Sequence, residues 1–422
     1  MPPEPLGLGI DLGSSGLRLA LADRRGARIA EVACQYPTPF NDPLGWRQGL
    51  IALAAQLTAE QRKQVAAIAT DGTSGTLLLC RPDGSLAPGP LGQALPYHQA
   101  CPEQGEAAAA IACSGPAASS SGSLARALAL LAAAETAGES GPWLLRHQAD
   151  WLMGWLLNCW HWGEEGNNLR LGWDLQRQCW HGAIGQQSWA GALPEVIDSG
   201  STVGLLAHGA AAALGLAEGC RVVAGSTDAN AGVLAANPDM GDGISVLGTT
   251  LVLKQWVPQP ISAPGVSSHR LGGRWLVGGA ANAGAGVLRQ FFNDAQLAEL
   301  SRQIDPRETS GLDLRPLPNR GERFPIDDPE LEPVLGPRPV SDALFLQGLL
   351  EGLARHEAAG WARLQELGAA PVRRVISLGG GARNPQWRAI RERLLGVPVL
   401  NRPKLSAALG MARLAAAALP HP

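Results

Sequence analysis

The sequence is poor in charged residues and has no basic excess. Only 17% of its 422 residues are charged, and 34 basic side chains against 37 acidic ones give a net charge of −3. A dedicated nucleic-acid-binding protein usually carries a basic excess or a basic stripe. We therefore expect no nucleic-acid partner. Because 45% of the residues are hydrophobic, the low charge does not indicate disorder.

Long uninterrupted apolar runs are also missing. The two most apolar stretches, Ala107–Glu135 and Leu405–Leu419, are broken by Arg126 and Arg413, so neither predicts a membrane span. The first residues, MPPEP, contain no basic segment followed by an apolar one, and we expect no secretory signal. These features predict a cytoplasmic protein without a membrane partner.

The cysteines lack the spacing of a zinc site or a redox pair, and several common catalytic motifs do not occur. The seven cysteines include no Cys-x-x-C pair, which favours reduced thiols over a disulfide framework or a structural zinc site. No His-x-x-x-His, Gly-x-Ser-x-Gly or Gly-x-x-x-x-Gly-Lys-Ser/Thr motif occurs. Glycine, by contrast, is in excess, with 53 of 422 residues against roughly 7% in average proteins. At ~150 residues per domain, the length favours two domains.

Two similar strand–turn–strand patterns lie about half a chain apart. Leu6–Asp23 and Gly243–Val257 each consist of an apolar run, a Gly/Ser/Thr turn and a second β-like run. The turns begin at Gly13 and Gly248, which are 235 residues apart (248 − 13). This separation predicts two related halves, each with one hairpin. Elsewhere in the chain we expect strands at 65–71, 76–80, 220–225 and 372–378, and helices at 47–63, 107–160 (interrupted at 114–123), from 287, at 385–395 and at 405–419.

The first hairpin has the residues of a phosphate-binding turn. Its glycines allow the backbone to approach an anion closely, and Ser14 and Ser15 add hydroxyl groups. Asp11 fits this interpretation if Mg²⁺ and its waters lie between carboxylate and phosphate. The alternative is an ordinary polar hairpin tip. A dinucleotide fingerprint is disfavoured, because no helix follows Gly13.

Two other strand ends carry polar clusters. The DGTSG segment at Asp71–Gly75 could hold a polyhydroxyl ligand, although an Asp-Gly turn would look the same. Asp228 follows a buried strand among small residues, which suits a general base that must come within ~3 Å of a hydroxyl group. It could also cap the alanine-rich helix that follows. Both interpretations can hold together.

The second half carries the features of a nucleotide site. Gly248 and Thr249 form the second candidate phosphate turn. The three glycines Gly379–Gly381 lie between a strand and a helix start, which suits a nucleoside, with Asn384 and Trp387 nearby. Eight of the 13 tryptophans fall within 143–189, and we expect most of them in the core rather than against a sugar. Together the windows describe an ATP site between two lobes.

These segments resemble the FGGY family of carbohydrate kinases. GIDLGSSGLR is similar to the first phosphate motif, VAGSTDANAG to the catalytic-aspartate segment, SVLGTTLVLK to the second phosphate motif, and SLGGGARNPQW to the adenosine motif. The resemblance implies an α/β, two-lobed, actin-like ATPase (ribonuclease H-like) fold, with ATP and sugar in the interdomain cleft. Residues 1–233 would form the sugar-binding lobe, with 406–422 packing back on it, and 234–405 the nucleotide-binding lobe.

Within the family, the D-ribulose kinases of cyanobacteria and plants, often labelled xylulose-kinase-like, look most similar. ATDGTSGTLLLC, YHQACP, LRQFF and LPNRGERFPI have close counterparts there, and this branch extends the expected location to the cyanobacterial cytosol or a plastid. Many members contact sugar through Trp-Asn-Asp or Trp-Gln-Asp, where this chain has Tyr97-His98-Gln99. The missing acid, and a chain shorter than the usual ~500 residues, disfavour glycerol and xylulose as substrates.

The resemblance also implies a reaction and a set of site residues. The reaction is ATP-dependent phosphorylation of a small ketose, D-ribulose, with ATP and Mg²⁺ as cofactors. D-xylulose, another pentulose or a polyol is the alternative substrate. The sequence leaves open whether the protein is a monomer or a homodimer. A non-catalytic sensor and an actin-like ATPase are the alternatives from other classes. Asp228 would be the general base, and Asp11 would position Mg²⁺, through water. Sugar contacts would be Asp11, Gly72, Thr73, Ser74, Gln99 and Asp228. ATP contacts would be Gly13, Ser14, Ser15, Arg18, Gly248, Thr249, Gly284, Gly380, Gly381, Asn384 and Trp387.

Overall fold

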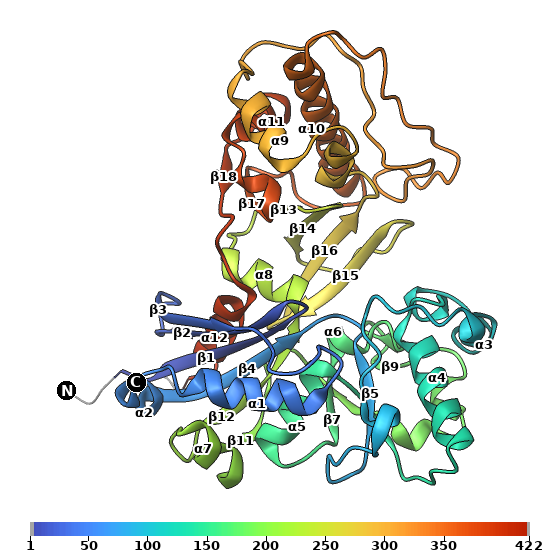
Figure 1. Ribbon diagram of the computed structural model, residues 1–422, viewed down its shortest axis with the longest axis vertical. Helices are drawn as coiled ribbons and strands as arrows, with labels where there is room; N and C mark the ends of the chain where they lie inside the picture. Colours follow the sequence, from blue (N-terminus) through green and yellow to red (C-terminus); the bar gives the residue numbers. More distant parts are fainter. Residues whose placement is uncertain (1–3, 420–422) are drawn as a thin grey trace. The chain divides into compact units, whose positions relative to one another are not determined.

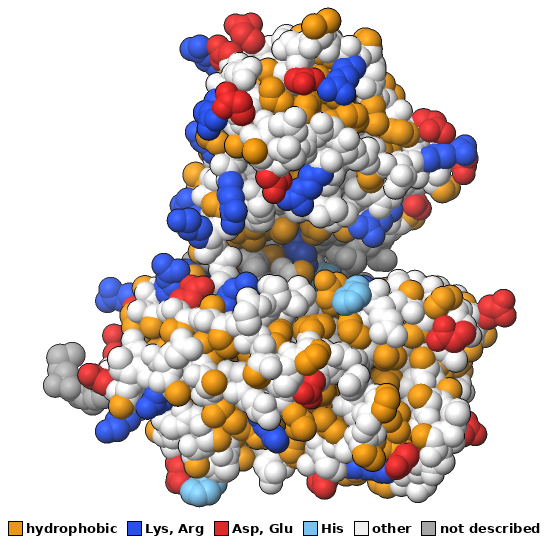
Figure 2. Space-filling model, viewed as in Figure 1, with side chains coloured by type: hydrophobic (Ala, Val, Ile, Leu, Met, Phe, Trp, Pro, Cys, Tyr) orange, Lys and Arg blue, Asp and Glu red, His pale blue; other side chains and the backbone are white. Residues whose placement is uncertain are grey.

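A computed structural model describes residues 4–419, which divide into two compact units (Figure 1). The N-terminal unit contains the described residues up to 235, together with 270–273 and those from 406 onward. The C-terminal unit contains 236–269 and 274–405. On the face shown in Figure 2, basic and acidic side chains are interspersed. Within residues 4–419, no helix has the length and hydrophobicity needed to cross a membrane.

A six-stranded sheet forms the centre of the N-terminal unit, in the order β11-β12-β4-β1-β2-β3. The strands are β1 (Leu6–Gly13), β2 (Gly16–Ala22), β3 (Arg28–Cys34), β4 (Val65–Gly72), β11 (Thr202–Leu205) and β12 (Arg221–Thr227). β1 and β2 form the hairpin expected from the sequence. β4 runs parallel to both β1 and β12. The carboxyl ends of these three strands therefore meet at one edge of the sheet.

Helix α12 (Ala407–Ala417) lies against β1 in the N-terminal unit (Figure 1). The contact is so close that a Cβ atom added to Gly9 would lie 1.9 Å from the carbonyl oxygen of Ala408. At Gly7 the same addition would lie 2.4 Å from the Ala412 oxygen. Gly7 and Gly9, whose spacing resembles part of a dinucleotide fingerprint, thus allow α12 to pack directly on β1.

The remaining elements of the N-terminal unit cover the sheet and extend beyond it. The helices are α1 (Pro43–Ala54), α2 (Ala59–Gln64), α3 (Gly105–Ala112), α4 (Ser123–Thr136), α5 (Gln148–Leu157), α6 (Glu165–Asn168), α7 (His208–Leu214) and α8 (Asp228–Ala236). The short strands are β5 (Leu77–Cys80), β6 (Leu144–His147), β7 (Trp162–Glu164), β8 (Trp173–Asp174), β9 (Cys179–Trp180) and β10 (Glu195–Ile197). The helix expected across 107–160 is interrupted, because α4 ends at Thr136, Gly138 follows with a φ of +69°, and Leu144–His147 pair with β5 as strand β6.

The C-terminal unit repeats the arrangement of the first sheet. Its six strands follow the order β15-β16-β14-β13-β17-β18, and β13 pairs antiparallel with β14 and parallel with β17. The strands are β13 (Asp242–Leu247), β14 (Leu251–Val257), β15 (Val266–Leu271), β16 (Arg274–Ala280), β17 (Arg374–Leu378) and β18 (Val399–Asn401), and the helices are α9 (Asp294–Arg302), α10 (Asp342–Glu366) and α11 (Pro385–Leu395). The helix expected from Val287 is instead a short 3₁₀ helix, Ala285–Gln290, because Gly284 and Gly286 pack against the β13–β14 turn.

A buried ion pair joins the helices of the C-terminal unit to its sheet. Glu357 on α10 contacts the guanidinium of Arg391 on α11 at 2.5 and 2.7 Å, and both side chains are 1% exposed. The Ser245 hydroxyl on β13 donates to Glu357, and Arg391 donates to the Ser377 hydroxyl on β17. The pair therefore fixes α10 and α11 over the two strands whose ends carry the glycine-rich turns.

Candidate active site

Three carboxyl groups lie at one sheet edge of the N-terminal unit. Asp11 on β1 is the direct register partner of Asp71 on β4. Asp71 is in turn opposite Ser226 on β12, two residues before Asp228 at the start of α8. The structure thus brings the two predicted catalytic aspartates to the same edge. It adds Asp71, which lies in the predicted DGTSG segment but is not among the residues predicted to contact sugar or ATP.

The environments of these carboxyls differ. Asp11 is 3% exposed, and Arg18 donates to its Oδ2 at 2.9 Å; burial nevertheless outweighs Arg18 and raises the pKa of Asp11. Asp71 is fully buried, and neither of its oxygens accepts a hydrogen bond from a donor within residues 4–419. Burial, followed by the charges of Asp11 and Asp228, raises the pKa of Asp71 well above its ordinary value. Asp71 is therefore better suited than Asp11 to hold a proton.

Asp228 is the accessible member of the group. It is half-buried, and its Oδ1 accepts the backbone N–H of Ala229 at 2.7 Å, at the first turn of α8. The side chain thus contacts the first turn of α8 while the residue remains partly exposed, and the helix-start and general-base interpretations are compatible.

The predicted sugar-binding residues of the DGTSG segment fall into two kinds. Thr73 is buried, and its hydroxyl bonds Thr76 Oγ1 at 2.6 Å and Gln148 Oε1 at 2.8 Å. A Cβ atom added to Gly72 would lie 3.1 Å from the backbone nitrogen of Ala149, so this glycine admits the start of α5. Ser74, which follows Thr73 in the loop, is half-buried. Thr73 and Gly72 thus shape the loop, and Ser74 is the member placed to contact a ligand.

The other predicted residues of this unit lie around the same edge or beyond it. Gly13 ends β1, and its carbonyl accepts the Tyr36 hydroxyl at 2.8 Å. Ser14 and Ser15 are exposed at the hairpin tip. Gln99 is exposed, and its backbone carbonyl accepts a hydrogen bond from Arg126 at 2.9 Å. The serines are therefore open to an incoming phosphate.

A pocket of about 780 Å³ opens in the C-terminal unit, within the size range of small-molecule sites. Its wall includes six of the predicted ATP-binding residues: Gly248, Thr249, Gly380, Gly381, Asn384 and Trp387. Gly284 is not in the wall, although its neighbours Ala285 and Gly286 are. A Cβ atom added to Gly284 would lie 2.4 Å from the Thr249 carbonyl oxygen, so this glycine lies beneath the turn and supports it.

The glycine loop of this pocket has one open and one packed position. A Cβ atom added to Gly380 would meet no atom within 4 Å, whereas at Gly381 it would lie 2.4 Å from the Trp387 ring. Asn384 caps α11 by accepting the Trp387 backbone N–H at 3.0 Å, and its amide donates to Ser301 at 2.8 Å. Trp387 and Asn384 therefore fix the loop, while Gly380 presents bare backbone to the pocket.

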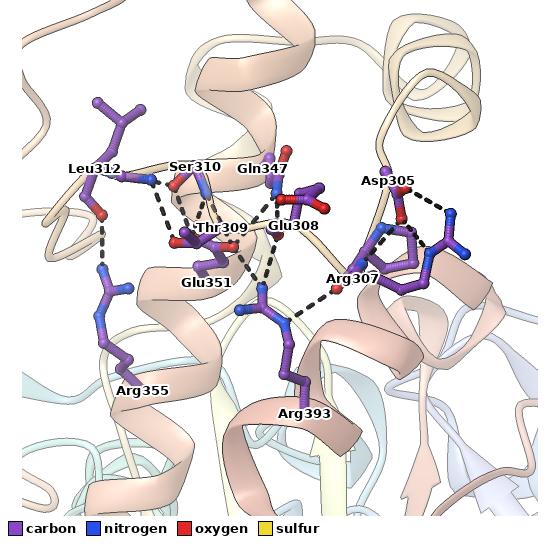
Figure 3. Close-up of polar contacts among 12 residues, drawn as sticks. Asp305, Arg307, Glu308, Thr309, Ser310, Leu312, Gln347, Glu351, Arg355 and Arg393 are labelled. Atoms are coloured by element: carbon purple, nitrogen blue, oxygen red, sulfur yellow. Dashed lines mark hydrogen bonds and ion pairs between the residues drawn. The ribbon is translucent and has the colours of Figure 1, made fainter.

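Helix α9 supplies one side of the pocket, and the segment that follows it is held by a polar network shown in Figure 3. Glu351 on α10 accepts the Ser310 hydroxyl and the Arg393 guanidinium, both at 2.6 Å. Arg393 also donates to the carbonyls of Pro306 and Glu308, at 3.1 Å each. The segment that follows α9 is thus fixed to α10 and α11. No local sequence pattern marks these residues, which lie about 40 or more positions apart.

A second buried carboxylate supports the Gly248 turn. Glu322 accepts the backbone N–H groups of Asn282 and Ala283, at 2.5 and 3.0 Å. Ala283 in turn accepts the N–H of Leu251 at 2.7 Å, directly after the turn. The LPNRGERFPI segment, which the sequence marks by its resemblance alone, therefore acts as a support for the β13–β14 hairpin.

The described residues fit a Mg²⁺ ion that is bound mainly by waters and substrate phosphates, and not one held by a cluster of protein side chains. Within residues 4–419, no three His, Cys, Asp or Glu side chains form a metal-holding group. Mg²⁺ in phosphoryl-transfer sites is bound by one or two carboxylates together with waters and substrate phosphates. Asp11, at the hairpin that would hold the phosphates, fits that role.

Comparison with known proteins places this geometry in context. Residues 243–419 match the model of the FGGY family of carbohydrate kinases, C-terminal domain. Over 97% of this chain and 89% of the other, the fold is similar to xylulose kinase from Rhodospirillum rubrum, with a TM-score of 0.78 and 21% identity. A xylulose kinase from Lactobacillus acidophilus (TM-score 0.76, 16% identity, 97% and 89% covered) and Plasmodium falciparum glycerol kinase with ADP (0.76, 14%, 98% and 89%) are also similar. Residues 243–419 are thus similar to the C-terminal domain of FGGY carbohydrate kinases, and the chain has the two-domain actin-like ATPase fold.

Proposed function

We propose that the protein is an ATP-dependent kinase that converts D-ribulose to D-ribulose 5-phosphate. The observation that carries the proposal is the accessible Asp228 carboxylate, which lies at the same sheet edge as Asp11 in a unit separate from the nucleotide-sized pocket. The choice of D-ribulose rests on the ATDGTSGTLLLC and LPNRGERFPI segments and on the absence of an acid at Tyr97-His98-Gln99.

The proposed reaction is an in-line displacement. Asp228 accepts the proton of the primary hydroxyl as that oxygen forms a bond to the γ-phosphorus and the bond to the departing ADP oxygen breaks. Ser74 and Gln99 bind the ketose, and Asp11 orients the reacting end. Asp228 afterwards releases its proton to solvent.

The remaining proposed contacts bind the nucleotide. Gly248 and Thr249 hold phosphates, with Gly13, Ser14, Ser15 and Arg18 on the other hairpin, while Gly380 and Gly381 contact the nucleoside. When bound through water to Asp11, Mg²⁺ supplies positive charge that neutralises the phosphates. Phosphoryl transfer depends mainly on such positioning and charge stabilisation.

The test is the Asp228→Asn variant in a coupled ADP-release assay with D-ribulose, D-xylulose, L-ribulose and glycerol. Loss of a general base typically costs 10²–10⁴-fold, so we expect at least ~100-fold lower kcat with ATP binding and melting temperature preserved. Asp342→Asn is the matched control, since Asp342 also begins a helix but is paired with Arg338 at the surface.

Each other outcome excludes a specific part of the proposal. Turnover retained in Asp228→Asn would exclude Asp228 as the base. A wild type that prefers D-xylulose would exclude the D-ribulose assignment but leave the kinase reaction. Sugar binding without ADP release would favour a sensor, and ADP release independent of sugar would favour an ATPase.

A further inference from the structure

Arg126 on α4 is a fully buried cation with an unusual set of partners. Its side chain is 0% exposed, and within residues 4–419 no carboxylate forms an ion pair with it. Burial, followed by the charge of Arg170, lowers the pKa of Arg126 to about 10, so it stays charged at neutral pH. Burying a charge is costly unless its hydrogen bonds are satisfied. Its position therefore calls for an explanation.

The guanidinium is satisfied by backbone carbonyls from three separate segments. Nη1 donates to Gly75 at 3.2 Å, and Nε donates to Gln99 at 2.9 Å. Nη2 donates to Tyr97 and to Ser121, the latter at 3.1 Å. The planar fork of five donors in arginine can hold several acceptors in fixed directions, which a lysine ammonium cannot.

Two of these segments are the proposed sugar-binding loops. Gly75 directly follows Ser74, and the Tyr97–Gln99 segment contains Gln99, the other proposed sugar contact. A Cβ atom added to Gly75, whose φ is +102°, would lie 3.1 Å from Nη1 of Arg126, so the glycine leaves room for the guanidinium. The two loops are also joined directly at their ends, where the Tyr97 N–H donates to Thr76 Oγ1 and Leu77 and Leu95 exchange backbone hydrogen bonds at 3.1 and 2.8 Å. Arg126 adds the side-chain link, which bonds the carbonyls of Gly75, Tyr97 and Gln99 to one guanidinium.

We propose that Arg126 is a positioning residue for the ketose. It fixes the Ser74 loop relative to the Tyr97–Gln99 segment and thereby sets how tightly the sugar is held, without touching the sugar itself. The inference rests on the proposed function. It predicts an effect on sugar binding beyond any general loss of stability.

The chain offers a matched control in Arg146 on β6. This side chain is also buried, and it donates to the carbonyls of Trp160, Ala192 and its own neighbour Leu145, at 2.6, 3.0 and 2.7 Å. Burial lowers its pKa to about 10 as well. The segments that it joins include none of the proposed sugar contacts. A purely structural role would make the two arginines equivalent.

The first experiment compares Arg126→Lys with Arg146→Lys. We expect Arg126→Lys to raise the KM of the best sugar substrate at least ten-fold while the KM of ATP changes less than two-fold. Arg146→Lys should lower the melting temperature to a similar degree and leave the sugar KM unchanged. Equal changes in sugar KM, or a change confined to the melting temperature, would overturn the proposal.

Chemical rescue supplies a readout that a general packing defect would not move. N-ethylguanidinium matches the atoms that Arg126→Ala removes beyond Cβ. At millimolar concentration it should lower the sugar KM of Arg126→Ala at least three-fold and leave that of Arg146→Ala unchanged. No rescue of Arg126→Ala, or equal rescue of both variants, contradicts the role.

Hydrogen exchange separates this inference from the proposed function, because it needs no substrate. Arg126→Lys should increase amide exchange in residues 73–76, 97–100 and 119–122, and Arg146→Lys should not. If the wild type phosphorylates no sugar, the proposed function fails and the exchange result alone decides whether Arg126 holds the loops. Unchanged exchange in those segments overturns the inference whether or not the wild type is active.

Discussion

The buried pair Glu357–Arg391 allows a prediction with a defined sign and size. Replacing Arg391 with Met removes a cation from a site where both partners are 1% exposed. The Glu357 carboxylate would then remain buried without its counter-charge. Removing one partner of such a pair typically costs ~3–5 kcal/mol.

The contacts that Glu357 keeps in the Arg391→Met variant determine where its loss of stability falls within the range of ~3–5 kcal/mol. Its carboxylate keeps the Ser245 hydroxyl and, at 3.4 Å, the Trp361 indole N–H. These donors compensate the charge in part, so we expect about 3–4 kcal/mol for Arg391→Met. Adding Glu357→Gln removes the unpaired charge and keeps the acceptor for Ser245. The double variant should therefore be about 1–2 kcal/mol more stable than Arg391→Met, although it departs further from the native pair.

These differences in the free energy of unfolding are measured by guanidinium chloride unfolding, followed by tryptophan fluorescence. Where two transitions are seen, each is assigned to one unit and fitted separately. Arg338→Met is the control, because its ion pair with Asp342 is about half exposed on both sides. Such a surface pair contributes ~0–1 kcal/mol. If the double variant is less stable than Arg391→Met, desolvation of the unpaired carboxylate does not explain the loss.

Further predictions concern packing, acid stability and the nucleotide pocket. Gly9→Ala should lose at least ~1–3 kcal/mol, measured by thermal unfolding, because its Cβ would lie 1.9 Å from the Ala408 oxygen; unchanged stability would refute direct helix-on-strand contact. The pKa of Glu351 is lowered, since hydrogen bonds from Ser310 and Arg393 outweigh the raising effect of burial. The stabilisation that ionised Glu351 contributes to folding is therefore complete above the unfolded pKa of about 4.3, and it is lost as the pH falls through the lower folded pKa. The Glu351→Gln variant lacks this contribution, so its melting temperature should decline less steeply between pH 5 and 3 than that of the wild type. An equally steep decline contradicts this. Gly380→Ala should keep the melting temperature but raise the KM of ATP about ten-fold, ~1.4 kcal/mol, and an unchanged KM would exclude nucleotide contact there.

The parts of the fold that the sequence predicts are those set by neighbouring residues. Both hairpins, at Gly13 and Gly248, are predictable because an apolar run, a glycine turn and a second run are local signals. The helix from Pro385 is predictable for the same reason, with a strand, three glycines and a proline in order. The 3₁₀ helix at Ala285–Gln290 is not, because its form depends on close packing of Gly284 under a distant turn.

The candidate site likewise contains residues that local sequence patterns identify and residues that only long-range contacts bring into place. Asp11 and Asp228 lie at strand ends that local sequence patterns mark, so both are predictable from the sequence alone. Asp71 lies in a marked window, but its pairing with Asp11 spans sixty residues and leaves no local trace. Arg126 is harder still to predict, since in the sequence it only interrupts an alanine-rich helix. Its acceptors are backbone carbonyls, which every residue possesses, so no sequence pattern identifies them.

The two sheets are similar in topology but differ in charge at equivalent positions. Two residues before the turn glycine, β1 has Asp11, paired with Asp71, whereas β13 has Val246, paired with Leu378. Carboxylates repel phosphate unless a cation lies between them. The pocket in the C-terminal unit has one carboxylate in its wall, Asp294, and that carboxylate is bonded to Arg289, so it would repel the phosphates of the proposed nucleotide only weakly. The carboxylate edge of the N-terminal unit instead suits the part of the reaction that needs a base and Mg²⁺. In the proposed kinase, the same topology with different residues would thus separate binding of the phosphate donor from activation of the acceptor.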